Sequence, residues 1–415
     1  MTGFGPIALH ASPSSQPPPR GIPPAGRFAL CAALCSSFGQ TFFIGLFGAE
    51  FRSDFSLTES TLGLIYGLAT LVSGVLMFWL GAIADHWSLR RVAVLAMGLL
   101  AGGALMIGLG DHLVLLLAGL FLVRLAGQGM SGHLAVVAAG RYAVRRRGRA
   151  MAMATYGFII GEALFPVLVA WAMGWTDWRG VWLMASAMVV ILALPLLIRL
   201  ASPLVGSGPG DDASEAADQA PTISRAQLFR DGRFLRVLAV VLIPPLVVTA
   251  TFLHQGTLAE RLGWGLGDVA SGFVLFAAIQ GVFAFAGGRL IDRFSARALL
   301  RFSLLPACVG LLALSLTSPE AALWLMFAGL GMTAGLNGVT SGAVWAELFG
   351  TAQLGLIRGV YSALMVVSTA IGPVIVGLLF DWQVSLLSMA IGYTAYALVV
   401  PFIVVPGILG FGPKR

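Results

Sequence analysis

Charge is what this chain has least of. Among its 415 residues, 10% are Asp, Glu, Lys or Arg, whereas 58% are hydrophobic. A soluble domain carries about 25% charged residues and at most about half apolar ones. This small number of charged residues cannot cover the water-exposed surface of a soluble protein of 415 residues. The composition therefore excludes a soluble enzyme. The 53 glycines agree with an all-α polytopic membrane protein, because glycine is more frequent in membrane helices than in soluble ones.

Cysteine and the common catalytic motifs are also scarce or missing. Cys31, Cys35 and Cys308 are too few for a disulfide framework, and we expect them to act as small packing residues. The sequence has no phosphate-binding loop, no H-E-x-x-H pair and no G-x-S-x-G elbow. We therefore expect no enzymatic activity, no cofactor and no metal site. If the protein moves a solute across the membrane, an ion gradient is the remaining energy source for that movement. A proton is then the expected coupling ion.

The distribution of the basic residues along the chain indicates the membrane topology. Lysine occurs once and arginine 24 times, and the net charge is +7. Of these 25 residues, 21 fall in the two termini and in every second predicted loop, which excludes a nucleic-acid surface and follows the positive-inside rule. We therefore expect both termini in the cytoplasm. The preponderance of Arg over Lys is typical of a GC-rich bacterial genome, so we expect the protein in the lipid bilayer of a cell inner membrane.

Twelve apolar segments follow a Pro-rich start, and each is long enough to cross a membrane as a helix. Residues 1–27 are expected to be a disordered tail, 28–200 a six-helix bundle, 201–233 a polar cytoplasmic linker, 234–409 a second six-helix bundle and 410–415 a tail. The predicted spans are 28–50, 60–84, 89–110, 112–140, 148–174, 178–200, 234–260, 265–291, 297–317, 320–349, 354–380 and 383–409.

The two halves repeat a loop motif. The pattern G-x-x-x-D-[HR]-x-S-x-R occurs at residues 81–90, after the second span, and again at 288–297, after the eighth. A second echo pairs Asp177-Trp178, before the sixth span, with Asp381-Trp382, before the twelfth. Because the two offsets nearly agree, at 207 and 204 residues, the sequence predicts a tandem duplication of six spans.

These features resemble the major facilitator superfamily of transporters over all twelve spans. The family's loop signature is G-x-x-x-D-R-x-G-R-R, from which this chain departs at His86, Ser88 and Leu89. The segment from Arg124 to Gln128 resembles the family's R-x-x-Q-G element, with one extra residue before the Gln, and the basic loop 141–149 resembles that of monocarboxylate-type members. The resemblance implies alternating access around a cavity lined by spans one, four, seven and ten. The resemblance also implies a protein that works as a single chain.

The repeated loops are candidates for a cytoplasmic gate. Paired charges at the mouth of the transporter can latch one face shut and separate when the halves rock. The alternative is that these charges only anchor the interface and set topology. The candidate gate residues are Gly81, Asp85, Arg90, Gly288, Asp292, Arg293, Arg297, Glu347 and Arg358.

Two charges are predicted to lie inside the membrane. Arg124 falls ~18 Å along its span at 1.5 Å per residue, and a charge at that depth costs about 2.5–3.5 kcal/mol unless it meets a partner or water. Glu162 lies near the middle of span five, and Gln128 shares the face of Arg124. An Arg124–Glu162 pair that opens when Glu162 takes up a proton would couple proton and anion. The alternative is a permanent ion pair that only joins two helices.

Other polar side chains within the spans complete the candidate site. Membrane-embedded polar groups often bond only to their own or neighbouring helices, which is the alternative for each of them. His254 and Gln255 lie in the outer third of span seven, where they can form an extracellular gate. The candidate solute-contacting or coupling residues are Arg124, Glu162, Gln128, Gln40, Tyr156, Asn337, His254 and Gln255.

Three functions fit the sequence. The first is proton-coupled transport of a small organic anion, such as a monocarboxylate, which Arg124 and the basic loop favour. The second is proton-antiport efflux of drugs or metabolites, favoured by the R-x-x-Q-G-like element and by 26 Phe and 10 Trp. The third is a receptor that binds a solute on the same scaffold without transporting it.

Overall fold

The computed structural model describes residues 22–143, 146–204, 223–351 and 353–409, except for the side chains of 82–85. These residues form helices and short connections without a strand. Eleven helices are long and apolar enough to cross a membrane, and one bent pair, Pro24–Gly39 with Thr41–Phe55, makes twelve. The predicted all-α polytopic membrane fold is confirmed. Most of the predicted tails and linker lies outside the described residues.

The N-terminal half contains spans one to six, several of them interrupted within the membrane. Its elements are α1 (Pro24–Ser36), η1 (Ser37–Gly39), α2 (Thr41–Ile44), η2 (Gly45–Phe47), α3 (Gly48–Phe55), α4 (Glu59–His86), α5 (Leu89–Leu109), α6 (Leu113–Val123), η3 (Arg124–Ser131), α7 (Gly132–Arg141), α8 (Arg147–Ala172), α9 (Trp178–Met188), η5 (Val189–Ala193), α10 (Leu194–Ala201) and η6 (Ser202–Leu204).

The C-terminal half contains spans seven to twelve after one short helix. Its elements are α12 (Arg225–Arg230), α13 (Gly232–Val241), α14 (Ile243–Leu253), α15 (Gln255–Leu262), α16 (Leu266–Phe294), α17 (Ala296–Leu300), α18 (Leu305–Leu316), α19 (Pro319–Phe349), α20 (Leu354–Asp381), α21 (Leu386–Val404) and α22 (Pro406–Leu409).

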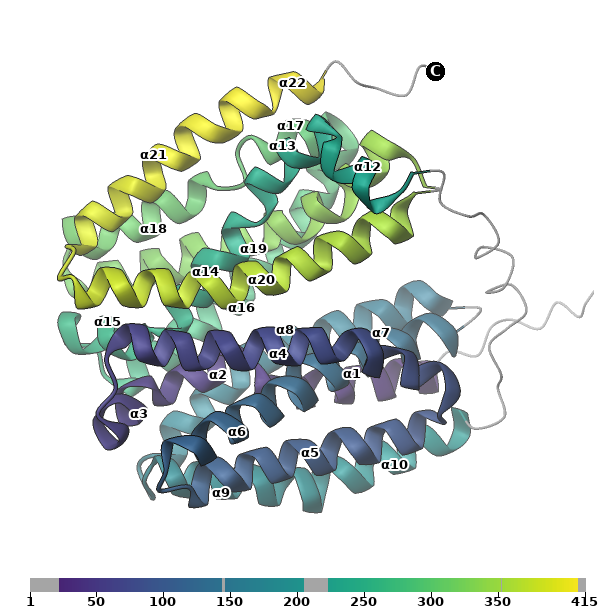
Figure 1. Cartoon of the computed structure of the whole chain (residues 1–415), viewed down its shortest axis with the longest axis vertical. Helices are drawn as coiled ribbons and strands as arrows, with labels where there is room; N and C mark the ends of the chain where they lie inside the picture. Colours follow the sequence, from purple (N-terminus) through teal and green to yellow (C-terminus); the bar gives the residue numbers. More distant parts are fainter. Residues whose placement is uncertain (1–21, 144–145, 205–222, 352, 410–415) are drawn as a thin grey trace, which may run out of the picture.

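The two halves lie side by side, with the N-terminal half in purple and blue and the C-terminal half in green and yellow (Figure 1). We call the end where Leu204 and Ile223 lie the linker end. The opposite end, where α3, α9 and α15 lie, is the distal end (Figure 1). Helix α4 packs against α20 and helix α8 against α16, so two helix pairs form the seam between the halves.

Side-chain caps begin the helices that follow the repeated loops. The Ser88 hydroxyl accepts a hydrogen bond from the amide of Arg91 at the start of α5, and the Ser295 hydroxyl accepts one from the amide of Ala298 at the start of α17. Such a cap satisfies a backbone donor that the first helical turn leaves free. The repeated serine therefore caps the following helix in both halves.

Span one breaks at Gln40, a feature that the sequence did not predict. The backbone of Gln40 is extended, with φ −84° and ψ 153°, and the two parts of the span meet at 41°. Beyond the break, the amide of Phe43 donates to the carbonyl of Gln40 rather than to that of Gly39. The carbonyl of Gly39 consequently needs another donor inside the membrane.

Small residues let the halves approach closely along the seam. A Cβ atom on Gly63 of α4 would lie 2.5 Å from the carbonyl oxygen of Pro373 in α20, and one on Gly67 would lie 2.7 Å from that of Ala370. Small residues at helix interfaces allow this approach of backbones in membrane proteins. The seam therefore requires glycine at these positions.

We predict that Gly63→Ala destabilises the protein. The added methyl group overlaps the Pro373 carbonyl, and such overpacking costs about 1–3 kcal/mol. The control is Gly102→Ala in α5, where a Cβ meets no atom within 4 Å and the helix gains about 0.5–1 kcal/mol. Thermal unfolding of the purified protein should give a lower Tm for Gly63→Ala alone. Equal Tm values for the two variants would contradict a close seam.

Candidate functional site

A cavity of about 320 Å³ lies between the two halves. Spans one and five of the N-terminal half and spans seven, eight, ten and eleven of the C-terminal half contribute to its wall. The lining residues are Gln40, Thr41, Phe42, Glu162, Pro244, Pro245, Val248, Thr249, Phe252, Phe276, Gln280, Ala334, Asn337, Gly338, Ser341, Tyr361 and Met365.

Glu162 is the charged side chain of this lining. It lies on α8, and its Oε2 accepts a hydrogen bond of 3.0 Å from Nε2 of Gln280 on α16, across the seam. The other polar groups of the lining are amides and hydroxyls, and Phe42, Phe252 and Phe276 supply aromatic walls. The cavity thus combines one carboxylate with apolar and neutral polar surface, which suits an amphipathic solute.

Gln40 and Asn337 also line the cavity, as the sequence predicted. Gln40 is the residue at the break of span one, and it contributes to the cavity wall at that break. The Asn337 amide nitrogen lies 3.5 Å from the carbonyl oxygen of Val241, and its Oδ1 is buried without a hydrogen-bond partner. Asn337 thus brings an unpaired buried acceptor to the cavity wall.

Arg124 lies outside the lining and secures the broken span. It is 1% exposed. Its Nη1 donates to the Gly39 carbonyl at 2.9 Å, its Nε donates to the Thr70 hydroxyl at 3.1 Å, and its guanidinium lies 4.8 Å from the centre of the Tyr66 ring. The Tyr66 hydroxyl is hydrogen-bonded to that of Thr41. Arg124 therefore supplies the donor that the break at Gln40 requires.

The Arg124–Glu162 pair expected from the sequence is absent from the described hydrogen bonds and ion pairs. Arg124 bonds to span one and span two, whereas Glu162 bonds to span eight. The pair was expected because the break in span one was not. The break leaves the Gly39 carbonyl without a helical donor, and this carbonyl binds the Arg124 guanidinium. Gln128 is half-buried in η3 and Tyr156 on α8 is 54% exposed, and neither lines the cavity.

The expected lining by spans one, four, seven and ten is therefore only partly correct. Span four contributes none of the lining residues, and spans five, eight and eleven contribute Glu162, Gln280 and Tyr361. Gln280 and Tyr361 were missed by the sequence reasoning. The signal that could have found Gln280 is a lone amide near the middle of an apolar span, the same signal that identified Glu162.

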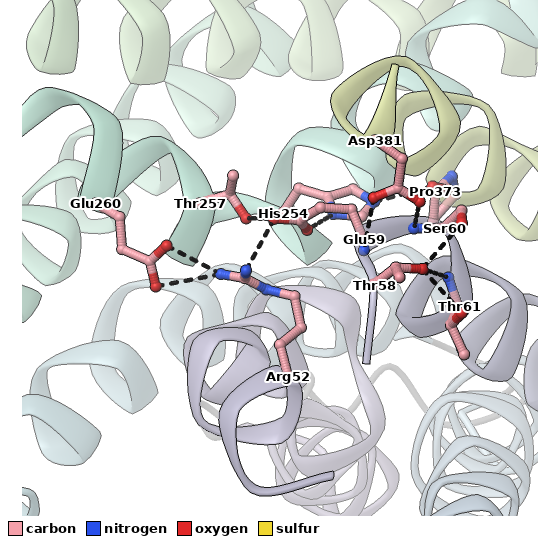
Figure 2. Close-up of polar contacts among 10 residues, drawn as sticks. All are labelled: Arg52, Thr58, Glu59, Ser60, Thr61, His254, Thr257, Glu260, Pro373 and Asp381. Atoms are coloured by element: carbon pink, nitrogen blue, oxygen red, sulfur yellow. Dashed lines mark hydrogen bonds and ion pairs between the residues drawn. The ribbon is translucent and has the colours of Figure 1, made fainter. Parts of the chain in front are cut away.

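A polar cluster joins the halves at the distal end (Figure 2). At its centre, one oxygen of Glu59 accepts from the Thr257 hydroxyl at 2.6 Å and lies 3.0 Å from Nη1 of Arg52. The other oxygen lies 3.0 Å from Nδ1 of His254, whose Nε2 lies 2.9 Å from the Pro373 carbonyl. Four helices from both halves thus meet at one carboxylate.

Further contacts extend this cluster. Arg52 also pairs with Glu260 at 3.1 Å, and Asp381 accepts from the backbone amides of Glu59 and Ser60 at 3.1 and 3.0 Å (Figure 2). We call Arg52, Glu59, His254, Thr257, Glu260 and Asp381 the distal cluster. Nearby, the Gln255 amide donates to the Phe42 carbonyl at 3.1 Å, so Gln255 also joins the halves.

The two Asp-Trp pairs of the second sequence echo make different contacts. Asp177 accepts from the amide of Gly180 and caps α9 within its own half. Asp381 instead ends α20 and caps α4 of the other half, while Ser385 caps α21. The two Asp-Trp pairs therefore occupy matching positions in the sequence but perform different tasks. Glu59, Arg52 and Asp381 were missed because their partners in the other half are 195 to 322 residues away in the sequence.

Comparison with known proteins decides the family. The model described as Major Facilitator Superfamily matches residues 29–279 and 246–408. The chain belongs to the major facilitator superfamily. It is therefore a membrane transporter, and the two six-helix halves are the repeats of that fold. Among the described residues there is no group of three His, Cys, Asp or Glu side chains that could hold a metal ion.

Individual relatives are more distant. A tetracycline resistance protein, class H, of Pasteurella multocida is 31% identical over 157 residues, so the chain spans about a third of that relative's length, 35% of each protein. Two solved structures share the fold. A bacterial homologue of the human lysosomal transporter Spinster, inward-facing and unoccupied, has a TM-score of 0.70 at 14% identity, covering 95% of this chain and 100% of that one. The nucleoside transporter NupG has 0.69 at 12%, covering 92% and 98%.

The superfamily loop motif at the linker end is partly described. In the C-terminal half, Nε of Arg297 lies 3.2 Å from Glu347, which also accepts from the amides of Ala296 and Arg297 at the start of α17. Arg297 donates to the Ile408 carbonyl, and Arg358 donates to that of Gly342. These contacts tie α17, α19, α20 and α22 together within one half.

The remaining gate candidates are described in less detail. The side chain of Asp85 lies outside the described residues. Arg90, Asp292 and Arg293 are exposed, and the Arg293 guanidinium lies 5.1 Å from the centre of the Phe294 ring. Gly81 faces His133, whereas nothing lies within 4 Å of a Cβ on Gly288. A latch between the halves at this end stays a prediction.

We predict that Arg124→Gln lowers stability by about 1.5–3 kcal/mol, because it removes a charged donor from a buried carbonyl. Thermal unfolding of the purified transporter measures the change. Arg90→Gln, which alters an exposed arginine of the same half, should leave Tm unchanged. A variant at Arg124 as stable as the one at Arg90 would show that the break at Gln40 does not depend on the guanidinium.

Proposed function

We propose that this transporter exports an amphipathic solute, neutral or cationic, in exchange for protons, with Glu162 as the site that the two share. One observation carries this proposal: Glu162 is the single charged side chain among the described residues that line the central cavity. Its position in the wall places a negative charge where a solute is held between aromatic side chains. A cationic or neutral aromatic molecule fits that surface better than an anion does.

The expected anionic solute finds less support. Its basis was Arg124 at mid-membrane, but that guanidinium is engaged by the Gly39 carbonyl and the Thr70 hydroxyl outside the cavity lining. A carboxylate solute would face Glu162 instead and would be repelled by it. The geometry therefore favours the second function suggested by the sequence, efflux of drugs or metabolites, over monocarboxylate transport.

Proton exchange follows from the same carboxyl group. Glu162 has one neutral hydrogen-bond partner, Gln280, and no basic side chain of the lining accompanies it. An intramembrane carboxyl without a fixed counter-ion can bind a proton or a cationic solute in turn, which is the requirement for antiport. The Gln280 bond crosses the seam, so occupancy of Glu162 also acts on the contact between α8 and α16.

Relatives support export. The Pasteurella multocida relative is named for tetracycline resistance, and the matched region is about a third of each chain. The two solved structures support the scaffold for alternating access, in which two repeats rock around a midplane site. Because both halves of the transport path belong to one chain, the proposed working unit is a monomer.

The proposed membrane is an inner membrane, with the linker end in the cytoplasm. Support comes from the basic residues at this end, among them Arg141, Arg230 and Arg297, since cytoplasmic loops are enriched in Arg and Lys. The distal cluster then faces the outside and closes that side of the cavity.

We predict that Glu162→Gln abolishes proton-driven transport. In proteoliposomes with an imposed pH gradient, the wild type should take up ethidium or tetracycline and not lactate. Uptake should fall by about tenfold or more in Glu162→Gln, because the cavity loses the group that carries the proton. The control Glu320→Gln, at an exposed acidic residue of α19, should transport normally.

Two results would contradict the proposal. Gradient-driven uptake of lactate without uptake of ethidium or tetracycline would reinstate the organic anion. Binding of these probes without flux under any gradient would instead indicate a receptor.

A further inference from the structure

His254 occupies an unusual position in the distal cluster. The residue is 1% exposed and lies at the junction of α14 and α15, where span seven is interrupted. Its ring touches both halves of the transporter, because Nδ1 faces Glu59 of α4 and Nε2 faces the Pro373 carbonyl of α20. Phe380 packs edge-on against the ring, 5.6 Å between ring centres.

Both ring nitrogens of His254 face oxygen atoms at hydrogen-bond distance, 3.0 Å and 2.9 Å. A backbone carbonyl can only accept, so Nε2 must carry a proton. An ionised carboxylate can also only accept, so Nδ1 then needs a proton as well. A neutral imidazole has one proton and would place a nitrogen lone pair against an oxygen lone pair at one of the two contacts.

The proton between His254 and Glu59 belongs on the histidine. The other oxygen of Glu59 accepts from the Thr257 hydroxyl at 2.6 Å and faces the Arg52 guanidinium at 3.0 Å. Both contacts stabilise the ionised carboxylate. Wherever the proton sits, the His254–Glu59 pair holds one proton more than a neutral imidazole with an ionised carboxylate.

We infer that the His254–Glu59 pair is a second proton-binding site of this transporter, filled when the distal end is closed and emptied when it opens. The two residues come from opposite halves, so opening the distal end separates the carboxylate from the ring. Only the closed state then offers two acceptors to the imidazole. Closing the distal end thus captures one proton from the side that this end faces.

The other charged groups around the His254–Glu59 pair do not neutralise its carboxylate in place of the proton. Arg52 divides its guanidinium between Glu59 and Glu260, so one cation serves two carboxylates. Asp381 lies beside Glu59 and caps α4, and the half-buried Glu50 of α3 adds further negative charge. Arg261 of α15 stacks on Phe380, which packs against the His254 ring. Its guanidinium lies 4.5 Å from the centre of the Phe380 ring. With four carboxylates against two arginines, the cluster favours a cationic imidazole.

Proton linkage sets the direction of the effect. The closed distal end binds one more proton than the open one, so acid favours closure and alkali favours opening. For one proton, the ratio of closed to open molecules changes by at most about tenfold per pH unit.

The role of this site in antiport rests on the proposed function, but proton-linked closure does not. If Glu162 is unrelated to coupling, the distal end still closes with acid as long as His254 and Glu59 bind a proton together. The test therefore measures conformation in the absence of solute.

The experiment measures distances between spin labels across the distal end. Labels on Trp175→Cys and Glu320→Cys, exposed positions in opposite halves, are introduced into the full chain after Cys31, Cys35 and Cys308 are replaced by Ser. Double electron–electron resonance in lipid nanodiscs then gives the closed fraction at pH 5.5, 7.0 and 8.5. We expect this fraction to fall as the pH rises, and His254→Gln to lose most of the pH response.

A control separates this site from others. His112→Gln changes an exposed histidine at the same end, so it should keep the response. An unchanged closed fraction across the pH range in the wild type would overturn the inference. So would a pH response that persists in His254→Gln.

A second variant covers the case in which His254→Gln does not fold. Glu59→Gln retains the size of the side chain but removes its charge, so it should shift the midpoint of closure to lower pH. An unchanged midpoint would contradict the site. Loss of gradient-driven flux with an intact distance response would count against the proposed antiport and not against this inference.

Discussion

The hydrogen bond from Arg124 to the Gly39 carbonyl is the contact on which the central site depends. Span one is extended at Gln40, and within a membrane the interrupted backbone needs a donor that no water supplies. With this donor in place, Gln40, Thr41 and Phe42 enter the cavity wall. The buried Arg124 guanidinium thus serves the backbone, which leaves Glu162 as the charge that faces the cavity.

The few charges within the membrane divide into three sets with different tasks. Arg124 maintains the shape of one half. Glu162 meets Gln280 across the middle of the seam, and the distal cluster joins the halves at one end through Glu59. The glycines beside Pro373 and Ala370 bring the backbones of α4 and α20 into close contact next to the distal cluster. Tight packing and polar contact therefore cooperate at the distal end, where the proposed outward closure lies.

Much of the fold follows from the sequence, because twelve long apolar runs and a repeated loop leave few alternatives. The central positions of Arg124 and Glu162 were also predictable from their depth in a span. Their partners were not, since the break at Gln40 lies inside a predicted span and has no proline to mark it. The distal cluster was missed for another reason: Glu59 and Asp381 read as ordinary helix-end charges until the fold brings their ends together.

The central claim is that Glu162 binds proton and solute in turn, and the reaction of this carboxyl with dicyclohexylcarbodiimide tests it most directly. The reagent modifies protonated carboxyl groups in apolar surroundings, and mass spectrometry of the labelled protein locates the product. The account predicts labelling of Glu162 that quickens as the pH falls and slows when ethidium occupies the cavity. Labelling of Glu162 that ethidium leaves unchanged, at concentrations that the transporter moves, would contradict a shared site.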